Sequence, residues 1–316
     1  MKIYGHEKQK TLFQRAIESG RLSHAYLFYG TKGVGKELFA RHVAQTMACI
    51  SGGVSPCETC LACRKVASGN HPDIIYVKAQ TQFIKIEDIR KIQEQAMIRP
   101  FESKRRVFII DEADRMNKEA ANAILKTLEE PSSSNVFFLI TANHRTLLPT
   151  VLSRCQKIRF DPLQETMVAK YLEMVESCDE QVAQAIAGLS QGSISRAVEM
   201  NTEEFLASRN AICEALHELL TKGALGAFLF AKTIGGDKED LKRKMEIIQS
   251  LFRDATYYKE TQSIEKLINK DKATLIRFLA SRLTTKEILE IFRMIVSATV
   301  AVAQNANRQI LLEVMA

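Results

Sequence analysis

Several features are scarce or missing in this chain, and each narrows its class. No apolar run approaches the roughly 20 residues that a membrane-spanning helix needs. The first six residues are too polar for a secretory signal peptide, and we find neither an internal repeat nor a low-complexity segment. A net charge of +7 is a modest excess for 316 residues. We therefore expect a soluble cytoplasmic protein whose charge permits contact with nucleic acid without requiring it.

What is present is a change of pattern along the chain. With 46% hydrophobic residues, 316 positions are enough for two or three domains. The first 160 residues alternate short apolar runs with helical patterns, which predicts an α/β fold with a parallel sheet. After residue 161 only helical patterns follow. The expected domains are 1–160, with an insertion near 49–63, then 161–203 and 204–316.

The predicted elements can be stated individually. Strands are expected at 25–29, 74–77, 107–111, 136–141 and 156–160. Helices in the first part are expected at 7–19, 86–97 and 118–129, with a further helical pattern after residue 36. Helices in the second part are expected at 165–176, 180–189, 194–200, 203–222, 238–259, 273–283 and 285–303.

A glycine-rich loop follows the first predicted strand. Gly30, Gly33 and Gly35 allow backbone amides to turn inward around phosphate, and Lys36 adds a positive charge. The next position, which normally carries a magnesium-binding hydroxyl, is Glu37. A carboxylate there brings negative charge towards phosphates that are already anionic. Hydrolysis by this loop is not expected, and binding of ATP with magnesium is an open question.

An acidic pair ends the third predicted strand. Asp111 is placed to hold magnesium through water, and Glu112 is the candidate for activating an attacking water. The alternative is a plain strand-to-helix turn in which Asp114 caps the next helix. Further on, Arg154 lies just before the last predicted strand, where a guanidinium could contact a neighbour's γ-phosphate. Alone, this arginine would indicate only a solvated surface charge.

Four of the seven cysteines are grouped. Cys57, Cys60 and Cys63 are spaced by two residues, and Cys49 precedes them at the end of a predicted helix. In a reducing cytosol this spacing favours zinc over disulfides. Four thiolates leave no open position for water, so a structural zinc ion is predicted. The isolated Cys155, Cys178 and Cys213 are interpreted as small buried apolar residues.

These motifs occur in a familiar order. The loop at 30–36, the cysteine group, Asp111-Glu-Ala-Asp114, the segment 124–131 and Ser153-Arg-Cys155 resemble bacterial DNA polymerase III clamp-loader subunits, which are AAA+ proteins. The resemblance covers about the first 200 residues and implies a helical lid domain at 161–203. The helical remainder, 204–316, resembles the collar domain that joins the family's subunits into a ring. Within the family, Glu37 points to the delta-prime subfamily rather than to the ATP-hydrolysing gamma/tau motor subunits.

The resemblance implies a stator in a replication complex. Arg154 would act in trans on ATP held by an adjacent gamma/tau subunit, and Arg196 would correspond to a lid arginine that reads the γ-phosphate, its alternative being a simple helix-surface arginine. Implied partners are gamma/tau, delta, the sliding clamp and primer-template DNA; no membrane is implied. ATPase activity of the chain itself is expected to be absent.

Two other functions stay open. One is an ATP-hydrolysing motor subunit of the same complex, in which Glu37 is tolerated. The other is a non-catalytic zinc DNA-binding module that uses Lys104, Arg105 and Arg106, although these charges are too few to carry affinity alone.

The last predicted helix carries an apolar stripe. Its members are Ile288, Ile291, Phe292, Ile295, Ala298 and Val302. The stripe extends over several turns at helical spacing, as expected for a helix that contributes to a domain core and to subunit assembly. The periodicity alone does not separate these two roles.

Overall fold

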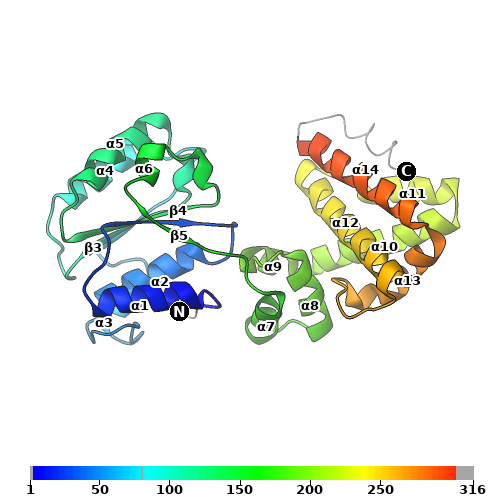
Figure 1. Ribbon diagram of the computed structural model, residues 1–316, viewed down its shortest axis with the longest axis horizontal. Helices are drawn as coiled ribbons and strands as arrows, with labels where there is room; N and C mark the ends of the chain where they lie inside the picture. Colours follow the sequence, from blue (N-terminus) through cyan, green and yellow to red (C-terminus); the bar gives the residue numbers. More distant parts are fainter. Residues whose placement is uncertain (1–2, 80, 304–316) are drawn as a thin grey trace. The chain divides into compact units, whose positions relative to one another are not determined.

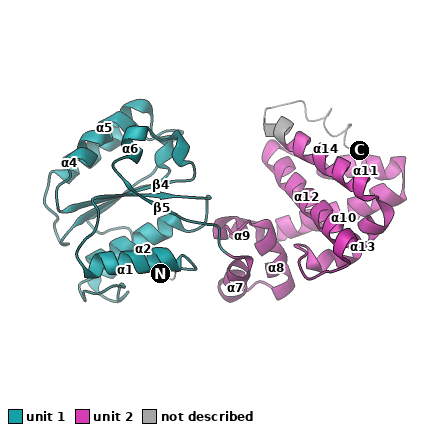
Figure 2. Cartoon of the chain, in the orientation of Figure 1, with its two compact units in different colours: residues 1–163 teal, residues 164–316 magenta. Residues whose placement is uncertain are grey.

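The protein is described by a computed structural model that covers residues 3–79 and 81–303, with side chains described up to residue 299. The chain divides into two compact units, Met1–Leu163 and Gln164–Ala316 (Figure 2). The first is an α/β unit and the second is helical, which confirms the predicted fold class. The finer division of the second unit at residue 203 stays a prediction. Among the described residues, no helix is both long and apolar enough to span a membrane.

A five-stranded sheet forms the centre of the first unit (Figure 1). Its strands are β1 (Ala25–Tyr29), β2 (Ile74–Val77), β3 (Arg106–Ile110), β4 (Asn135–Thr141) and β5 (Gln156–Arg159). The order is β2-β3-β4-β1-β5, and every neighbouring pair is parallel. All five predicted strands are present, and their bounds differ from the prediction by at most one residue. The carboxyl ends of parallel strands meet at one edge, where polar side chains can converge.

Alternating residues of the strands feed two separate cores. Leu27, Phe108 and Leu139 lie in one cluster with apolar side chains of α4 (Ile86–Ala96) and α5 (Lys118–Glu129). Phe28 and Phe138 lie in the other, against Phe13 of α1 (Glu7–Glu18) and side chains of α2 (Lys36–Ala48). Because side chains alternate along a strand, a nearly continuous apolar strand can bury both faces. The unit is therefore a helix–sheet–helix sandwich, with α4, α5 and α6 over one face and α1 and α2 over the other (Figure 1).

The helices of the first unit are α1 (Glu7–Glu18), α2 (Lys36–Ala48), α3 (Leu61–Ala67), α4 (Ile86–Ala96), α5 (Lys118–Glu129) and α6 (Pro149–Leu152). The periodic helices were predicted within one residue, but α3 and α6 were not. The predicted alternative in which Asp114 caps a helix is wrong. Asn117 caps α5, since its side-chain oxygen accepts the amide of Ala120 at 2.8 Å.

The second unit consists of helices in the residues described. They are α7 (Glu165–Val175), α8 (Glu180–Leu189), α9 (Ile194–Met200), α10 (Glu203–Thr221), α11 (Ala224–Ile234), α12 (Lys238–Thr261), α13 (Ala273–Arg282) and α14 (Thr285–Ala303). The sequence predicted all of these except α11. Helices α7, α8 and α9 are the segment that the resemblance assigns to a lid domain.

A buried polar network holds the turn before α13 against α12. Asp254, fully buried in α12, accepts the backbone amides of Ile268 at 3.1 Å and Asn269 at 2.7 Å. Arg209 of α10 reaches the same turn through Asn269 at 2.9 Å and both carboxylate oxygens of Asp271. Buried polar groups that are satisfied in this way fix one arrangement of the chain.

The apolar stripe of α14 is partly core. Ile288, Ile295 and Ala298 are buried, whereas Ile291 and Phe292 are half-buried. The side chain of Val302 lies outside the described residues. The stripe therefore contributes to the packing of this unit, and its predicted role in assembly stays untested.

Candidate nucleotide-type and metal sites

The loop between β1 and α2 has the backbone form that a phosphate cradle needs. Gly30, Gly33 and Gly35 all have positive φ, at 143°, 78° and 97°. At Gly30 a side chain is also excluded by space, because an added Cβ would lie 2.0 Å from the carbonyl oxygen of Phe160. The glycines that the sequence singled out are thus required by this loop conformation.

Lys36 closes the loop on itself. Its ammonium donates to the carbonyl oxygens of Gly30 and Thr31, both at 2.7 Å. Burial lowers the pKa of Lys36 to about 8, opposed by the nearby Asp111 and Asp114 carboxylates. A bound phosphate would have to draw the ammonium away from these two carbonyl groups.

Glu37 forms an ion pair one turn further along α2. Its Oε1 lies 2.8 Å from Nε of Arg41, and the Arg41 guanidinium lies 4.6 Å from the centre of the Tyr76 ring. The carboxylate that replaces the expected hydroxyl is thus neutralised by its own helix. Tyr76 belongs to β2, so the contact joins α2 to the edge strand of the sheet.

Asp111 is surrounded by three donors: Tyr76 of β2, Lys78 just after β2 and the backbone amide of Glu112. Its Oδ2 accepts the Tyr76 hydroxyl at 3.1 Å and lies 3.3 Å from the Lys78 ammonium, while its Oδ1 accepts the amide of Glu112 at 2.9 Å. Burial, together with the Asp111 charge, raises the pKa of Tyr76, so its hydroxyl stays protonated and donates. Both oxygens of this carboxylate therefore have partners within the chain.

Glu112 is also paired. It has a left-handed backbone, with φ 51°, directly after β3. Its carboxylate lies 3.7 Å from Lys32 of the loop between β1 and α2 and 3.1 Å from Arg115. The candidate base thus lies between two cations, and its predicted role stays a prediction.

Thr141 is a site residue that the sequence analysis did not single out. It ends β4, is buried, and its hydroxyl donates to Asp114 at 2.6 Å and accepts the amide of Asn143 at 2.9 Å. A polar residue that follows the apolar run 136–140 at the carboxyl end of the strand could have indicated it.

The donor set at this edge does not fit magnesium with a nucleotide. Mg²⁺ requires about six oxygen ligands at about 2.0–2.1 Å in octahedral geometry. Here the loop hydroxyl is replaced by a carboxylate that pairs with Arg41, and Asp111 is already occupied by Tyr76 and Lys78. We derive no chemical step through a magnesium nucleotide at this site.

Arg154 lies between α6 and β5, with its guanidinium held on the chain's own surface. It donates to the carbonyl of Thr150 at 2.8 Å, contacts the Ser153 hydroxyl at 3.3 Å and pairs with Glu129 at 2.5 Å. About a third of its side chain is exposed, and Glu129 is more exposed still. An exposed ion pair of this kind contributes little stability, so a stronger anion could replace Glu129 at modest cost.

Arg196 lies in the second unit, on α9. Its guanidinium donates to Glu246 of α12 at 2.7 Å, and both side chains are about 30% exposed, at 31% and 29%. This pairing accounts for the residue within its own unit. Its predicted role as a γ-phosphate sensor stays a prediction.

The four grouped cysteines converge. The Sγ atoms of Cys49, Cys57, Cys60 and Cys63 all lie within 4.8 Å of one another, and those of Cys57 and Cys63 are 3.9 Å apart. A tetrahedral zinc ion with Zn–S bonds of about 2.3 Å holds its sulfurs about 3.8 Å apart. The cluster can therefore hold a metal such as zinc.

Backbone amides point at the sulfurs of this cluster. The amides of Cys57, Cys60 and Cys63 donate to the preceding sulfurs at 3.3 to 3.4 Å. Hydrogen bonds, first from the Ser51 side chain and then from the amide of Cys60, lower the pKa of Cys57 to about 5, whereas burial raises that of Cys63. A cation at the centre would favour the thiolate form of all four ligands.

The other cysteines have no such arrangement. Cys155 and Cys213 are buried and Cys178 is half-buried, and none is in a disulfide. Burial raises the pKa of Cys155 to about 12 and also raises that of the other two. The thiol form is favoured at all three positions, which agrees with their interpretation as packing residues.

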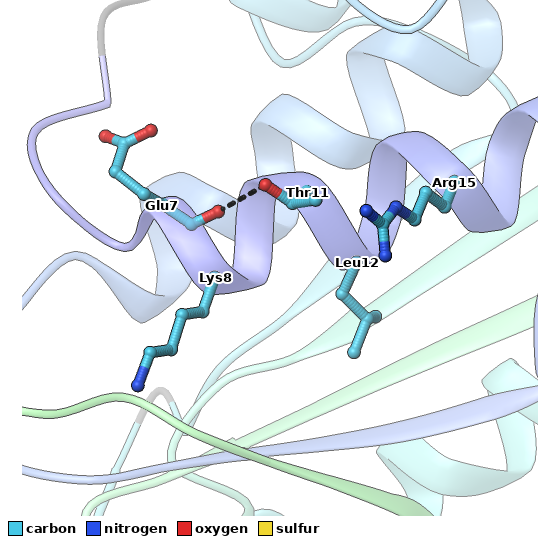
Figure 3. Close-up of a pocket in the computed structure, with 5 residues that line it drawn as sticks. All are labelled: Glu7, Lys8, Thr11, Leu12 and Arg15. Atoms are coloured by element: carbon cyan, nitrogen blue, oxygen red, sulfur yellow. Dashed lines mark hydrogen bonds between the residues drawn. The ribbon is translucent and has the colours of Figure 1, made fainter.

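Two remaining surface features offer little chemistry. Five residues of α1 line a shallow depression, in which the hydroxyl of Thr11 donates to the carbonyl of Glu7 at 3.0 Å (Figure 3). One helix alone supplies this lining. Of the basic triplet, Arg106 is fully buried and bonded to Asp73 at 3.0 Å, so it is not available to DNA.

Comparisons with known proteins agree along most of the chain. The family described as "DNA polymerase III, delta subunit" matches residues 5–164, and the family described as "DNA polymerase III, delta subunit, C terminal" matches residues 203–316. DNA polymerase III subunit delta' of Bacillus subtilis is 32% identical over 306 residues, which are 96% of this chain and 92% of that protein.

Other relatives are matched over a smaller part. DNA polymerase III subunit tau/gamma of Haemophilus influenzae is 36% identical over 171 residues, or 54% of this chain, but only 25% of that protein is covered. Among solved structures, a DNA polymerase III gamma subunit-related protein of Thermotoga maritima aligns with 95% of this chain and 99% of that chain, at 18% identity and a TM-score of 0.41.

Proposed function

Because the chain belongs to the family of DNA polymerase III clamp-loader subunits and is most like the delta-prime subunits within it, we propose that it is the stator of such a loader. In this role it supplies Arg154 in trans to ATP held by a neighbouring motor subunit. Its own phosphate loop does not hydrolyse ATP. The loader as a whole would place a sliding clamp on primer-template DNA.

One observation carries this proposal: the acidic residues of the chain's own site are already paired within the chain. Glu37 pairs with Arg41, Asp111 with Tyr76 and Lys78, and Glu112 with Lys32 and Arg115. A site that hydrolyses ATP needs these carboxylates for the metal and for water. The chain therefore has the form of a phosphate-loop protein without the means to act as a motor.

Arg154 suits action on a neighbour. The present partner of its guanidinium is one exposed carboxylate, Glu129, and the arginine keeps its backbone anchor at Thr150. A γ-phosphate carries more charge than a carboxylate and accepts the same planar pair of N–H groups. Exchange of Glu129 for phosphate would place positive charge where the transition state becomes more negative.

The proposed partners follow from the family. The chain would assemble with gamma/tau and delta subunits through its helical second unit, and would meet the clamp and DNA only as part of that complex. We also propose that the cysteine cluster holds one structural zinc ion. Four thiolates complete a tetrahedron, so no position is open for a reacting water.

The motor function is the second candidate, and the retained Lys36, Asp111 and Glu112 favour it. It predicts ATP turnover that depends on Lys36. The hypothesis of a DNA-binding module is weakened, because Arg106 is buried against Asp73. Only two of the three predicted charges, Lys104 and Arg105, then remain for contact with DNA.

The deciding experiment is ATP turnover by a loader reconstituted from this chain, motor subunits and delta, with clamp and primed DNA. We expect Arg154→Ala to abolish turnover at the one motor site that it serves, where such an arginine is worth about 10³-fold or more in rate. Lys36→Ala should leave turnover unchanged. Arg159→Ala is the matched control, since that arginine also forms an exposed ion pair, with Asp161.

A second variant separates a direct role from a local structural one. Glu129→Gln removes the carboxylate that holds Arg154 while leaving the guanidinium in place. Turnover should be unchanged or higher. Turnover lost equally in Glu129→Gln and Arg154→Ala, or lost in Lys36→Ala alone, would contradict the stator role.

A further inference from the structure

We propose that this chain carries a built-in substitute for magnesium, in which Tyr76, Lys78 and Arg41 occupy the groups that would bind the ion. Nucleotide at this phosphate loop would then bind in its metal-free form. Tyr76 is the residue that determines this specificity. The inference concerns the chain's own loop and does not depend on the proposed role of Arg154.

Two positions normally bind magnesium beside a loop of this kind. In a phosphate-loop protein, magnesium contacts the residue after the loop lysine and is held, through water, by the acid at the end of a neighbouring strand. Here those positions are Glu37 and Asp111. Both are carboxylates, and the one at position 37 replaces the usual hydroxyl. Each carboxylate also has an organic cation beside it, Arg41 at Glu37 and Lys78 at Asp111.

Arg41 lies one helical turn after Glu37, and its Nε is 2.8 Å from the Glu37 carboxylate. The other side of the guanidinium lies over the Tyr76 ring at 4.6 Å, a cation–π contact that fixes its direction. Glu37 is therefore held by an arginine that is itself held by the sheet.

Asp111 is only 8% exposed. The Tyr76 hydroxyl and the Lys78 ammonium share one of its oxygens, and the amide of Glu112 occupies the other. A hydrated magnesium ion would have to break the phenol bond and displace the ammonium. Mg²⁺ releases its own water reluctantly, which makes this exchange unfavourable.

Tyr76 is the centre of this arrangement. It contacts Arg41 through its ring and Asp111 through its hydroxyl, so one side chain links both metal-binding positions. Lys78 contributes less, because about half of its side chain is exposed and its ion pair is screened by water. Loss of the Tyr76 hydroxyl alone should therefore weaken the exclusion of the ion.

The test uses the full chain with ADP and Mn²⁺ as a stand-in for magnesium. Equilibrium dialysis counts protein-bound Mn²⁺ per chain in the presence of ADP. We expect no Mn²⁺ at this site in the natural chain. The variant Glu37→Thr/Tyr76→Phe/Lys78→Ala should bind one Mn²⁺, and its ADP affinity should rise at least tenfold with Mn²⁺ relative to EDTA. Tyr76→Phe alone should give an intermediate result.

Two controls make every outcome informative. Adding Asp111→Asn should remove the Mn²⁺ that the triple variant gains, which separates this site from the cysteine cluster. Circular dichroism and the zinc content check that each variant is folded, and Tyr76→Phe/Lys78→Ala serves if the triple variant is not. Mn²⁺ bound to the natural chain in an Asp111-dependent way would overturn the proposal, and so would folded variants that gain no Mn²⁺.

Discussion

At the scale of single residues, Gly30 occupies a position in which no side chain fits. Its φ of 143° and the 2.0 Å between a built Cβ and the Phe160 carbonyl exclude any side chain. Gly20 also has positive φ, at 67°, but nothing lies within 4 Å of its added Cβ. The two glycines therefore differ in the space around them and also in backbone demand, because a φ of 67° lies in the left-handed region that other residues can adopt and a φ of 143° lies well outside it.

This difference predicts unequal costs for the same substitution. Gly20→Ala should lower the free energy of unfolding of the first unit by about 1 kcal/mol, through backbone strain alone. Gly30→Ala should lower it by about 2–5 kcal/mol, because the loop and β5 must move apart. Denaturant unfolding of both variants measures this, and equal shifts in the midpoint would refute it.

Asp73 and Arg106 form the other residue-scale feature, a buried pair whose side chains are 0% and 2% exposed. Asp73 also accepts the amides of Phe101, Glu102 and Ser103, at 2.7 to 2.9 Å. Burial opposes the charge of Asp73, but these amides and Arg106 outweigh it and lower its pKa. The carboxylate is therefore more easily ionised in the folded chain than in the unfolded one.

The lowered pKa of Asp73 in the folded chain determines how stability changes with pH. The stability that Asp73 contributes is present above its unfolded pKa of about 3.9 and is lost as the pH falls through the lower folded value. Asp73→Asn should cost about 3–5 kcal/mol at neutral pH and should flatten the acid limb of the stability curve. Asp161→Asn, at an exposed pair with Arg159, should lower the free energy of unfolding by no more than about 1 kcal/mol and should leave the acid limb unchanged.

At the scale of elements, α3 depends on the cysteine cluster more than on packing. It has seven residues, and the sulfur of Cys60 accepts the amide of Cys63 where a polar cap would otherwise lie. Its apolar partners are few, chiefly Ala48 and Ile74. A helix this short is not stable on local interactions alone.

Removal of a bound metal should therefore have a local effect. We expect one zinc ion per chain in the purified protein and none in Cys60→Ser. Chelation should expose backbone amides of residues 49–67 to hydrogen exchange while the strands of the sheet stay protected. Cys155→Ser, a buried thiol outside the cluster, should keep the zinc. Retained protection of residues 49–67 after chelation would refute this prediction.

The helices α3, α6 and α11 were not predicted from the sequence, because none of them has the periodic apolar face on which such a prediction depends. The periodic helices α4 and α5 were predicted because each has a single apolar face. Helix α11 reads Ala-Leu-Gly-Ala-Phe-Leu-Phe, which is apolar on every side and so has no period. Helix α6 has only four residues and α3 is held by sulfur. A short segment, or one that is apolar on every side, shows no hydrophobic period from which a helix could be predicted.

The candidate site was predictable to the same extent. The loop glycines, Lys36, Asp111 and the cysteines are carried by motifs that are local in sequence. Tyr76 and Lys78 were not predicted, because they reach Asp111 only through the pairing of β2 with β3. Arg41 was not predicted either, although its spacing of four residues from Glu37 on a helix could have indicated the ion pair. Strand order cannot be read from chain order, so the occupied state of Asp111 became visible only in three dimensions.

At the scale of the whole molecule, the chain consists of two compact units, each with its own internal network. The first has the buried pair of Asp73 and Arg106, and the second has Asp254, which accepts two backbone amides and the side-chain amide of Asn269. Units that are compact in this way can unfold separately unless a large apolar interface joins them.

We therefore expect two unfolding transitions that respond to different changes. Asp254→Ala leaves buried N–H groups without an acceptor, which should cost about 1–3 kcal/mol or more and lower only the transition of residues 164–316. Asp73→Asn and metal chelation should lower only the transition of residues 1–163. Calorimetry of the full chain, with hydrogen exchange to assign each transition, tests this. A single transition lowered alike by both substitutions would mean that the two units unfold as one. The contributions of Arg154, the cysteine cluster and the second unit could then not be varied independently in the same chain.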